Sequence, residues 1–185
     1  MNDNTERELK IMLTEEQYNQ IRKDFEFDSC FEQTNTYYDT PDQKLYGQKG
    51  AFRIRQLPDH NVMTLKLPLD EITKQEYEYP TEASRPEELT QRELDFLREK
   101  AGVDLPMNQV ASFRTLRCIK NLPGAELCLD KTDFGSVTDY ELEYEYSHDH
   151  DGISTFNQIL SRYGLKFEKN RLSKLGRAIH YSSNL

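Results

Sequence analysis

Strict alternation of charged and apolar residues is the feature that most limits what this chain can fold into. The longest case is residues 140–146, Tyr-Glu-Leu-Glu-Tyr-Glu-Tyr, where four apolar or aromatic positions alternate with three carboxylates. Because successive side chains of a β-strand point to opposite faces, this period of two predicts a strand with one apolar and one acidic face. At least seven segments alternate in this way, several joined by turns with Pro or Gly. The pattern predicts an antiparallel sheet.

The charged faces of these strands do not all have the same sign. Acidic faces carry Glu6 with Glu8, Glu76 with Glu78, Glu126 with Asp130, and Glu141 with Glu143, whereas basic residues on corresponding faces are Arg53, Arg55, Lys66 and Arg117. For any one strand, a solvated face of the sheet explains such a pattern. Taken together, carboxylates spaced roughly 7 Å apart along a strand repel one another unless a cation neutralises them. Carboxylates without His or Cys partners favour Mg²⁺, Mn²⁺ or Ca²⁺, and converging basic groups favour a polyanion, so the combination indicates phosphate chemistry.

Three amphipathic helices are expected beside the sheet. Residues 14–25 begin with a capping box of Thr14 and Gln17, residues 86–102 begin at Pro86 and end at Gly102, and a third helix covers residues 153–163. Apolar residues make up only 36% of the chain, below the roughly 45–50% of ordinary globular domains. A sheet closed into a barrel, with a polar lumen and an apolar outer face under the helices, accounts for this low fraction, although periodicity alone does not show closure.

Length and charge narrow the remaining choices. The 185 residues, without internal repeats or linkers, predict a single domain over residues 1–185. Lys and Arg number 24 and Asp and Glu 33, for a net charge of −9, so binding to nucleic acid or to an anionic membrane is not expected. Cys30, Cys118 and Cys128 show no CxxC spacing; we expect three buried thiols, no disulfide, and a cytoplasmic protein without signal peptide.

A series of short motifs resembles the CYTH domain superfamily, also called triphosphate tunnel metalloenzymes, and specifically its small bacterial stand-alone members. The segment Glu6-Arg7-Glu8-Leu9-Lys10 is similar to the ExExK signature of the first strand. Further similarities follow in family order at residues 37–42, 51–55 and 64–66, at Glu76, and at residues 115–117, 129–130, 141–143 and 173–177. ExExK alone is a weak signal, but nine ordered matches over roughly residues 5–178 are a strong one.

The resemblance implies an α+β, mainly β fold: an eight-stranded antiparallel closed barrel that forms a tunnel, with flanking helices. It implies that Mg²⁺ or Mn²⁺ is bound by Glu6, Glu8, Asp130, Glu141 and Glu143. It also implies that a triphosphate is held by Lys10, Arg53, Arg55, Lys66, Arg117 and Lys174, with Arg177 as a further substrate-binding residue and with Glu76 orienting basic side chains or water. Lys174 and Arg177 could exchange roles, because this part of the family varies. Glu8, Glu143 and Lys10 are the candidate catalytic residues.

Hydrolysis of a terminal phosphoanhydride needs neutralised phosphate oxygens, an in-line water and little covalent chemistry from the protein. A metal-dependent triphosphatase acting on inorganic triphosphate or a related small-molecule triphosphate is therefore expected, as a monomer or homodimer. A class IV-type adenylate cyclase and a non-catalytic triphosphate- or polyphosphate-binding module remain alternatives. No Trp is present to stack a base; Tyr37, Tyr38 or Tyr46 could do so, although each is expected in the core.

Overall fold

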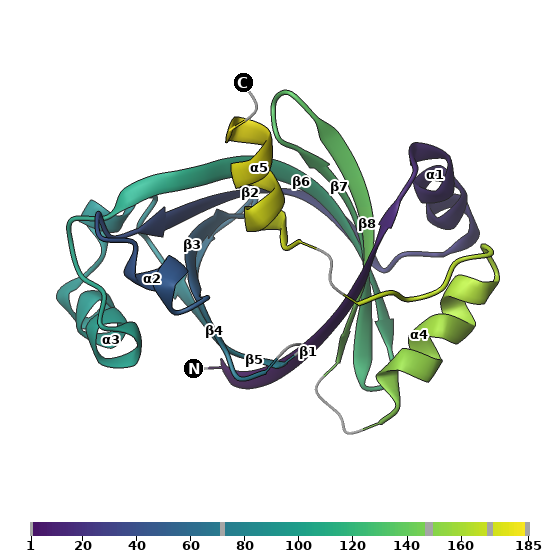
Figure 1. Cartoon of the computed structure of the whole chain (residues 1–185), viewed down its shortest axis with the longest axis horizontal. Coiled ribbons are helices and arrows are strands. Elements are labelled where there is room, and N and C mark those ends of the chain that lie inside the picture. The colour runs from purple at the N-terminus through teal and green to yellow at the C-terminus, as the bar shows by residue number, and fades with distance from the viewer. Residues whose placement is uncertain (1, 71–72, 147–149, 170–171, 184–185) are drawn as a thin grey trace.

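The protein is built from eight strands that surround a central tunnel, with most of the helices on the outside and the start of the C-terminal helix at the cavity (Figure 1). The structure, a computed structural model, describes residues 2–70, 73–146, 150–169 and 172–183, with side chains from Arg7 to Ser182. The strands are β1 Asn2–Leu13, β2 Ser29–Asp39, β3 Ala51–Gln56, β4 Asn61–Pro68, β5 Thr73–Thr81, β6 Asn108–Leu122, β7 Ala125–Asp133 and β8 Thr138–Tyr146. The helices are α1 Glu15–Asp24, α2 Lys44–Gly47, the 3₁₀ helix η1 Pro86–Glu88, α3 Gln91–Ala101, α4 Gly152–Ser161 and α5 Lys174–Ser183.

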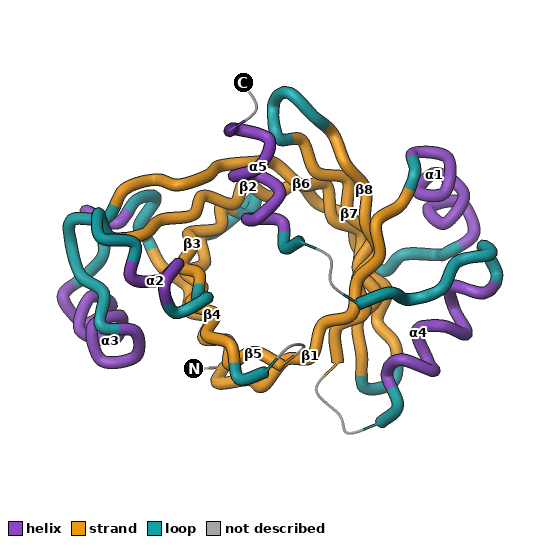
Figure 2. Tube along the Cα trace, in the orientation of Figure 1, coloured by secondary structure: helices purple, strands orange, loops and turns teal. Residues whose placement is uncertain are grey.

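The sheet is closed because β1 pairs with two strands. Its first half, Asn2–Arg7, lies antiparallel to β5, and its second half, Arg7–Leu13, lies antiparallel to β8. The order β1-β5-β4-β3-β2-β6-β7-β8 therefore forms a continuous barrel, and Figure 2 shows the strands as a ring. The predicted eight-stranded antiparallel barrel with flanking helices is confirmed.

The apolar faces of the strands point outward and form two cores under the helices. Leu9, Leu127 and Leu142 pack with Ile21 of α1 and Phe156 of α4. A second core is formed by Phe52, Ile54, Met63 and Leu65 with Leu94 and Leu97 of α3. Burying a side chain of this size contributes roughly 1.5–3 kcal/mol. Because the outer faces are covered in this way, the charged faces of the strands are directed into the tunnel.

The helix boundaries follow local capping signals. The capping box of Thr14 and Gln17 begins α1 as predicted. The helix expected from Pro86 begins later: residues 86–88 form only a 3₁₀ turn, and a second capping box, Thr90 with Glu93, begins α3. Gly102 ends α3 with φ of 67°, a left-handed conformation that glycine adopts without strain. Helices α2 and α5 were not predicted from the sequence.

The cysteine prediction is wrong for two of the three residues. Cys30 of β2 lies opposite Cys118 of β6, with their Cα atoms 4.1 Å apart, and the two are joined by a disulfide. The two cysteines are 88 residues apart in the chain. Only the β2–β6 register brings them together, so the sequence alone did not indicate the pairing. Cys128 is a buried free thiol, as predicted.

Of the three tyrosines expected in the core, Tyr37 and Tyr38 are buried and Tyr46 is not. Tyr38 packs in the outer core beside Phe52, whereas Tyr37 is buried on the tunnel side and stacks on Phe113. Tyr46 was expected in the core, but it is 72% exposed. Within the described segments of the chain, no helix combines the length and apolar character needed to cross a membrane.

Candidate functional site: a charged tunnel

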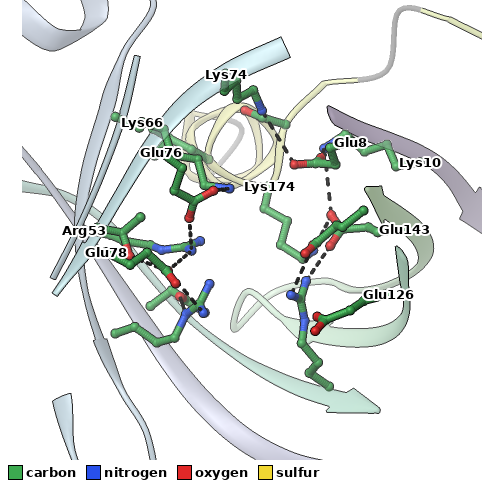
Figure 3. Close-up of a pocket in the computed structure, with 18 of the residues that line it drawn as sticks. Glu8, Lys10, Arg53, Lys66, Lys74, Glu76, Glu78, Glu126, Glu143 and Lys174 are labelled. Atoms are coloured by element: carbon green, nitrogen blue, oxygen red, sulfur yellow. Dashed lines mark hydrogen bonds and ion pairs between the residues drawn. The ribbon is translucent and has the colours of Figure 1, made fainter. Parts of the chain in front are cut away.

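The tunnel encloses a cavity of about 740 Å³. Each of the eight strands contributes lining residues, and Ser173 to Leu175 add the start of α5. Figure 3 shows that most of the side chains drawn are charged and that they converge from facing walls. The alternation of the strands puts these groups inside, since every second residue of a barrel strand faces the lumen.

One wall, formed by β3, β4 and β5, presents the predicted basic residues together with two glutamates. Lys66 Nζ lies 2.6 Å from Glu76 Oε2, and Arg53 Nη2 lies 3.6 Å from Glu76 Oε1 and 3.5 Å from Glu78 Oε1. Arg55 Nη1 lies 3.7 Å from Glu78 Oε1. Glu76 thus orients Lys66 and Arg53, the kind of contact that the sequence analysis expected of it.

Neutral groups of β2 hold the two arginines. Arg53 Nη1 donates to the Tyr37 hydroxyl at 3.3 Å, and Arg55 Nε donates to Asn35 Oδ1 at 3.1 Å. Burial alone lowers the pKa of Arg53, but Tyr37, Glu76 and Glu78 outweigh it and raise that pKa above its usual value. Burial and repulsion by Arg53 lower the pKa of Arg55 to about 10, because Glu78 offsets them only in part. Among the described residues, Arg55 has one carboxylate within ion-pair distance, whereas Arg53 has two.

The opposite wall gathers three of the predicted metal ligands; Glu143 lines the cavity, whereas Asp130 and Glu141 are buried beside it and are not among its described lining residues. Carboxylate oxygens of Asp130, Glu141 and Glu143 all lie within 4.8 Å of one another, and the residues are 0%, 0% and 4% exposed. Asp130 is directly opposite Glu141 in the β7–β8 register, which explains their proximity. Lys174 Nζ contacts all three groups, at 2.7 Å from Asp130 and 3.0 Å from Glu143, with Glu141 as its third partner.

Arg117 also contacts this cluster of carboxylates, which is called the acidic group below. Its guanidinium lies 2.7 Å from Asp130 Oδ2 and 3.3 Å from Glu145 Oε1, and it contacts Glu143. Burial would raise the pKa of Glu143, but Lys174 and Arg117 hold it well below its usual range. For Glu141, burial and the neighbouring Glu143 outweigh Lys174 and raise the pKa to about 7. The two glutamates therefore differ strongly in acidity although they neighbour each other.

The β1 residues connect the two walls. Lys10 Nζ contacts Glu8 and lies 3.9 Å from Glu143 Oε1, and Lys74 Nζ of β5 lies 3.7 Å from Glu8 Oε2. Burial acts to raise the pKa of Glu8, but Lys10 and Lys74 outweigh it and hold that pKa far below its usual range. The side chain of Glu6 lies outside the described residues; its backbone pairs with Lys74. Metal binding by Glu6 stays a prediction.

Arg177 takes a different place from the other predicted phosphate ligands. It is not among the described residues that line the cavity. Its Nε lies 2.7 Å from Asp139 Oδ2, its Nη1 donates to the Leu172 carbonyl at 2.9 Å, and its Nη2 contacts Glu141. These contacts join α5 to β8 and keep Lys174, three residues earlier, beside the acidic group. A direct contact of Arg177 with triphosphate stays a prediction.

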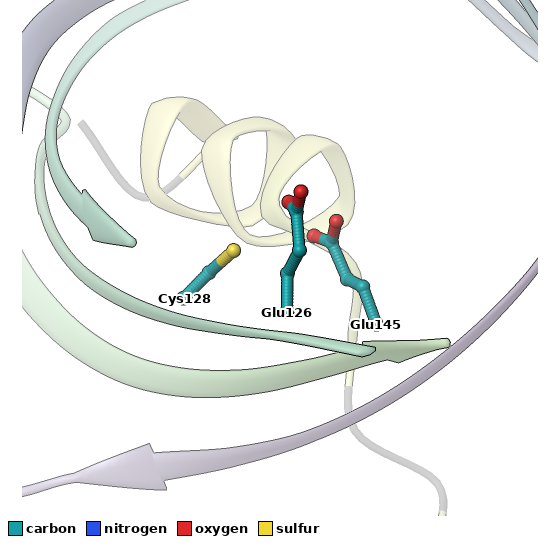
Figure 4. A group of neighbouring side chains, drawn as sticks. All are labelled: Glu126, Cys128 and Glu145. Carbon is teal, nitrogen blue, oxygen red and sulfur yellow. The ribbon is translucent and has the colours of Figure 1, made fainter. Parts of the chain in front are cut away.

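Several lining residues were not among the predicted site residues. Lys74, Glu78, Glu126 and Glu145 share the lumen face of their strands with predicted residues, so strand parity alone would have identified them. Glu126, Cys128 and Glu145 form a second group with ligand atoms within 4.8 Å (Figure 4). Burial raises the pKa of the Cys128 thiol well above its usual value, so this thiol stays neutral at neutral pH.

The comparisons with known proteins agree with this architecture. The sequence model of the CYTH domain matches residues 4–174, and the chain therefore belongs to the CYTH domain family. A Bacillus subtilis (strain 168) protein, provisionally named triphosphatase YjbK, is 28% identical over 89% of this chain and 90% of its own length.

Solved structures show the same fold. The protein bh2851 of Bacillus halodurans, provisionally called an adenylate cyclase, superposes with a TM-score of 0.78 and 21% identity over 96% of this chain and 98% of its own. HpAC1 of Hippeastrum, provisionally called an adenylyl cyclase and described as having a dominant triphosphatase activity, gives a TM-score of 0.77 and 21% identity over 96% and 95% of the two chains. PH1819 of Pyrococcus horikoshii OT3 gives a TM-score of 0.68 and 23% identity over 95% and 99%.

Proposed function

We propose that this protein is a metal-dependent triphosphatase that hydrolyses the terminal phosphoanhydride of inorganic triphosphate or a related small-molecule triphosphate. The observation that carries the proposal is that the basic residues of β3 and β4 and the carboxylates Glu8, Glu143 and Glu145 line one cavity of about 740 Å³. The name of the Bacillus subtilis relative and the activity described for the Hippeastrum protein support it. We also propose that residues 1–185 form a single domain.

The basic groups supply the grip on the phosphate chain. Arg53, Arg55 and Lys66 line the cavity on one wall, Arg117 and Lys174 line it on the other, and Lys10 of β1 lines it between them. Guanidinium and ammonium groups bind phosphate oxygens through charge-assisted hydrogen bonds, each contributing roughly 1.5–3 kcal/mol. Groups on two walls bind a chain of phosphates at several points, which orients its terminal phosphate for in-line attack.

The chemistry of the acidic group fits a hard divalent cation. Asp130, Glu141 and Glu143 offer only oxygen donors, as Mg²⁺ and Mn²⁺ prefer, and their burial favours an internal positive charge. Lys174 supplies that charge in this structure, so a metal ion held by these residues and by Glu8 requires its ammonium to move aside. When bound, such an ion would neutralise phosphate charge and polarise the scissile anhydride.

Glu8 and Glu143 are the proposed water-orienting residues. Both line the cavity, and both have a pKa well below the usual range, so they remain ionised at neutral pH. An ionised carboxylate accepts a hydrogen bond from a water and directs its lone pair toward phosphorus, although so weak a base removes a proton only late in the reaction. Lys10, which contacts Glu8 and lies near Glu143, is placed to stabilise charge on the phosphate under attack.

The test is a substrate panel with Mg²⁺ or Mn²⁺, in which orthophosphate release is measured from tripolyphosphate, ATP and pyrophosphate. We expect tripolyphosphate to be the best substrate, pyrophosphate to react slowly because it reaches fewer basic groups, and EDTA to abolish turnover. Cyclic AMP and pyrophosphate formed from ATP would instead establish a cyclase. Tight binding of tripolyphosphate without turnover would establish a binding module.

A further inference from the structure

The part of the tunnel wall that β2 forms differs in character from its neighbours. Among the described residues, the four side chains that β2 adds to the cavity are Phe31, Gln33, Asn35 and Tyr37, and all are uncharged. They lie between the basic face of β3 and Arg117 of β6. Neither the charge pattern of the sequence nor the proposed function assigns them a role.

Two of these residues have intramolecular partners. In the β2–β3 register Asn35 lies opposite Arg55 and Tyr37 opposite Arg53, and each accepts a hydrogen bond from the guanidinium across from it. A neutral acceptor fixes the direction of an arginine without cancelling its charge. The arginines are thereby oriented and remain available to an anion.

Gln33 continues the same spacing along β2 but has no such partner. The β2–β3 pairing ends with Thr34 opposite Gln56, so no arginine of β3 faces Gln33. On the other side Gln33 lies opposite Thr115, whose hydroxyl is paired with that of Thr132 at 3.1 Å. Gln33 is 3% exposed, and its Oε1 is buried without a hydrogen-bond partner among the described residues. Leaving a buried amide unpaired is costly, so its burial beside a cavity points to a ligand.

The surroundings of Gln33 indicate which ligand. One neighbouring lumen position along β2 is Asn35, which holds Arg55, and the other is Phe31, opposite Arg117 in the β2–β6 register. Arg55 and Arg117 repel each other, a contribution to the lowered pKa of Arg55. An anion between them relieves this repulsion, and an uncharged donor between two cations adds a hydrogen bond without adding to it.

We propose that Gln33 is a further substrate-binding residue whose amide Nε2 donates a hydrogen bond to a non-bridging phosphate oxygen of a triphosphate bound between Arg55 and Arg117. This assignment rests on the proposed function. The assignment places the amide with its oxygen and nitrogen exchanged, an orientation open to any glutamine side chain, so that Nε2 and not Oε1 occupies the buried unpaired position beside the cavity.

The experiment compares Gln33→Met, which keeps length and removes the donor, with Gln33→Glu, which keeps shape and adds a negative charge. Gln109→Met, at an exposed position of β6 outside the cavity lining, is the matched control. Calorimetric titration with tripolyphosphate and Mg²⁺ should give roughly 10- to 100-fold weaker binding for Gln33→Met, because a hydrogen bond to a charged group is lost. Gln33→Glu should bind more weakly still, and Gln109→Met like the parent.

Kinetics and stability separate a contact from a structural role. Because the contact is made to the bound substrate, Gln33→Met should raise KM and leave kcat nearly unchanged, and because it removes a buried unpaired oxygen its melting temperature should not fall below that of the parent. Parent-like tripolyphosphate binding by Gln33→Met would overturn the assignment while the proposed function stands. So would Gln33→Glu binding as tightly as the parent, since the position would then face a cation. A parent that binds no tripolyphosphate would overturn the proposed function and this assignment together.

Discussion

Replacing Lys174 by methionine tests how the acidic group of the tunnel is neutralised. In the parent, its ammonium contacts Asp130, Glu141 and Glu143, which are almost fully buried. Methionine keeps most of the length and removes the charge. Breaking a buried ion pair by removing one partner costs about 3–5 kcal/mol, since the remaining charge is left uncompensated.

The expected loss lies at the lower end of that range. Arg117 still neutralises Asp130 and Glu143, and Glu141, whose pKa is already raised to about 7, can take up a proton. We therefore expect the free energy of unfolding to fall by about 3 kcal/mol. At roughly 2.1 cal/mol/K of unfolding entropy per residue, this corresponds to a melting temperature about 8 °C lower in EDTA.

Mg²⁺ provides the second half of the test. In the parent the ion must displace an ammonium from the three carboxylates, whereas in Lys174→Met it need not. Saturating Mg²⁺, at about 100 times Kd, adds roughly 2.7 kcal/mol of stability, so the ion should recover most of the loss. At any subsaturating concentration it should raise the melting temperature of the variant more than that of the parent.

The control is Lys23→Met, which removes a lysine charge at an exposed position of α1. It should melt like the parent with and without Mg²⁺. A Lys174→Met variant as stable as the parent in EDTA would refute the idea that the ammonium compensates the buried carboxylates. A Mg²⁺-induced shift no larger than in the parent would refute the idea that lysine and metal compete for one site.

Three further predictions concern Glu141, Arg53 and the Cys30–Cys118 disulfide. The pKa of Glu141 is raised to about 7 from an ordinary 4.5, so its contribution to stability is full below pH 4.5 and is lost as pH rises to 7. Urea titrations of the metal-free protein should show the free energy of unfolding declining by up to about 3 kcal/mol over this range. The decline should be absent in Glu141→Gln. Arg53→Ala should weaken tripolyphosphate binding by roughly 1.5–3 kcal/mol. Arg53→Lys should recover only part of this, while Arg114→Ala, exposed and paired with Asp133, should bind like the parent; equal affinities throughout would contradict the proposed grip. Reducing the Cys30–Cys118 disulfide should lower the free energy of unfolding by about 2–4 kcal/mol, measured by melting with and without dithiothreitol; a Cys30→Ser variant should not respond.

The sequence predicted the lumen faces well because charge alternation encodes them directly. Tyr140, Leu142 and Tyr144 face the outer core or α1, while Glu141 and Glu143 face inward, as the period of two requires. The same parity correctly separates Arg117, which lines the cavity, from Arg114, which is exposed on the outer face. The closed fold follows from the resemblance and not from periodicity, since alternation looks the same in an open and a closed sheet.

What the sequence did not reveal depends on contacts between distant segments. Nothing local to Lys174 indicates that it will meet Asp130; the β7–β8 register and the docking of α5 determine that. The pairing of Cys30 with Cys118 depends in the same way on the β2–β6 register. Gln33 was not predicted as a site residue for another reason. An uncharged residue gives no signal in a charge pattern, and only the burial of its side-chain oxygen without a partner distinguishes it.

The charges around the cavity explain why the basic wall and the carboxylates are needed together. Among the described lining residues, eight side chains are cationic and six are carboxylates, so the tunnel is only weakly positive. A triphosphate brings several negative charges into a space where Glu126, Glu143 and Glu145 already repel it. Divalent cations that enter with the substrate change this balance, because each carboxylate then attracts the positive charge of a cation that is bound to the phosphates. A tunnel of this composition should therefore bind tripolyphosphate tightly only when Mg²⁺ or Mn²⁺ is present, which a purely basic tunnel would not require.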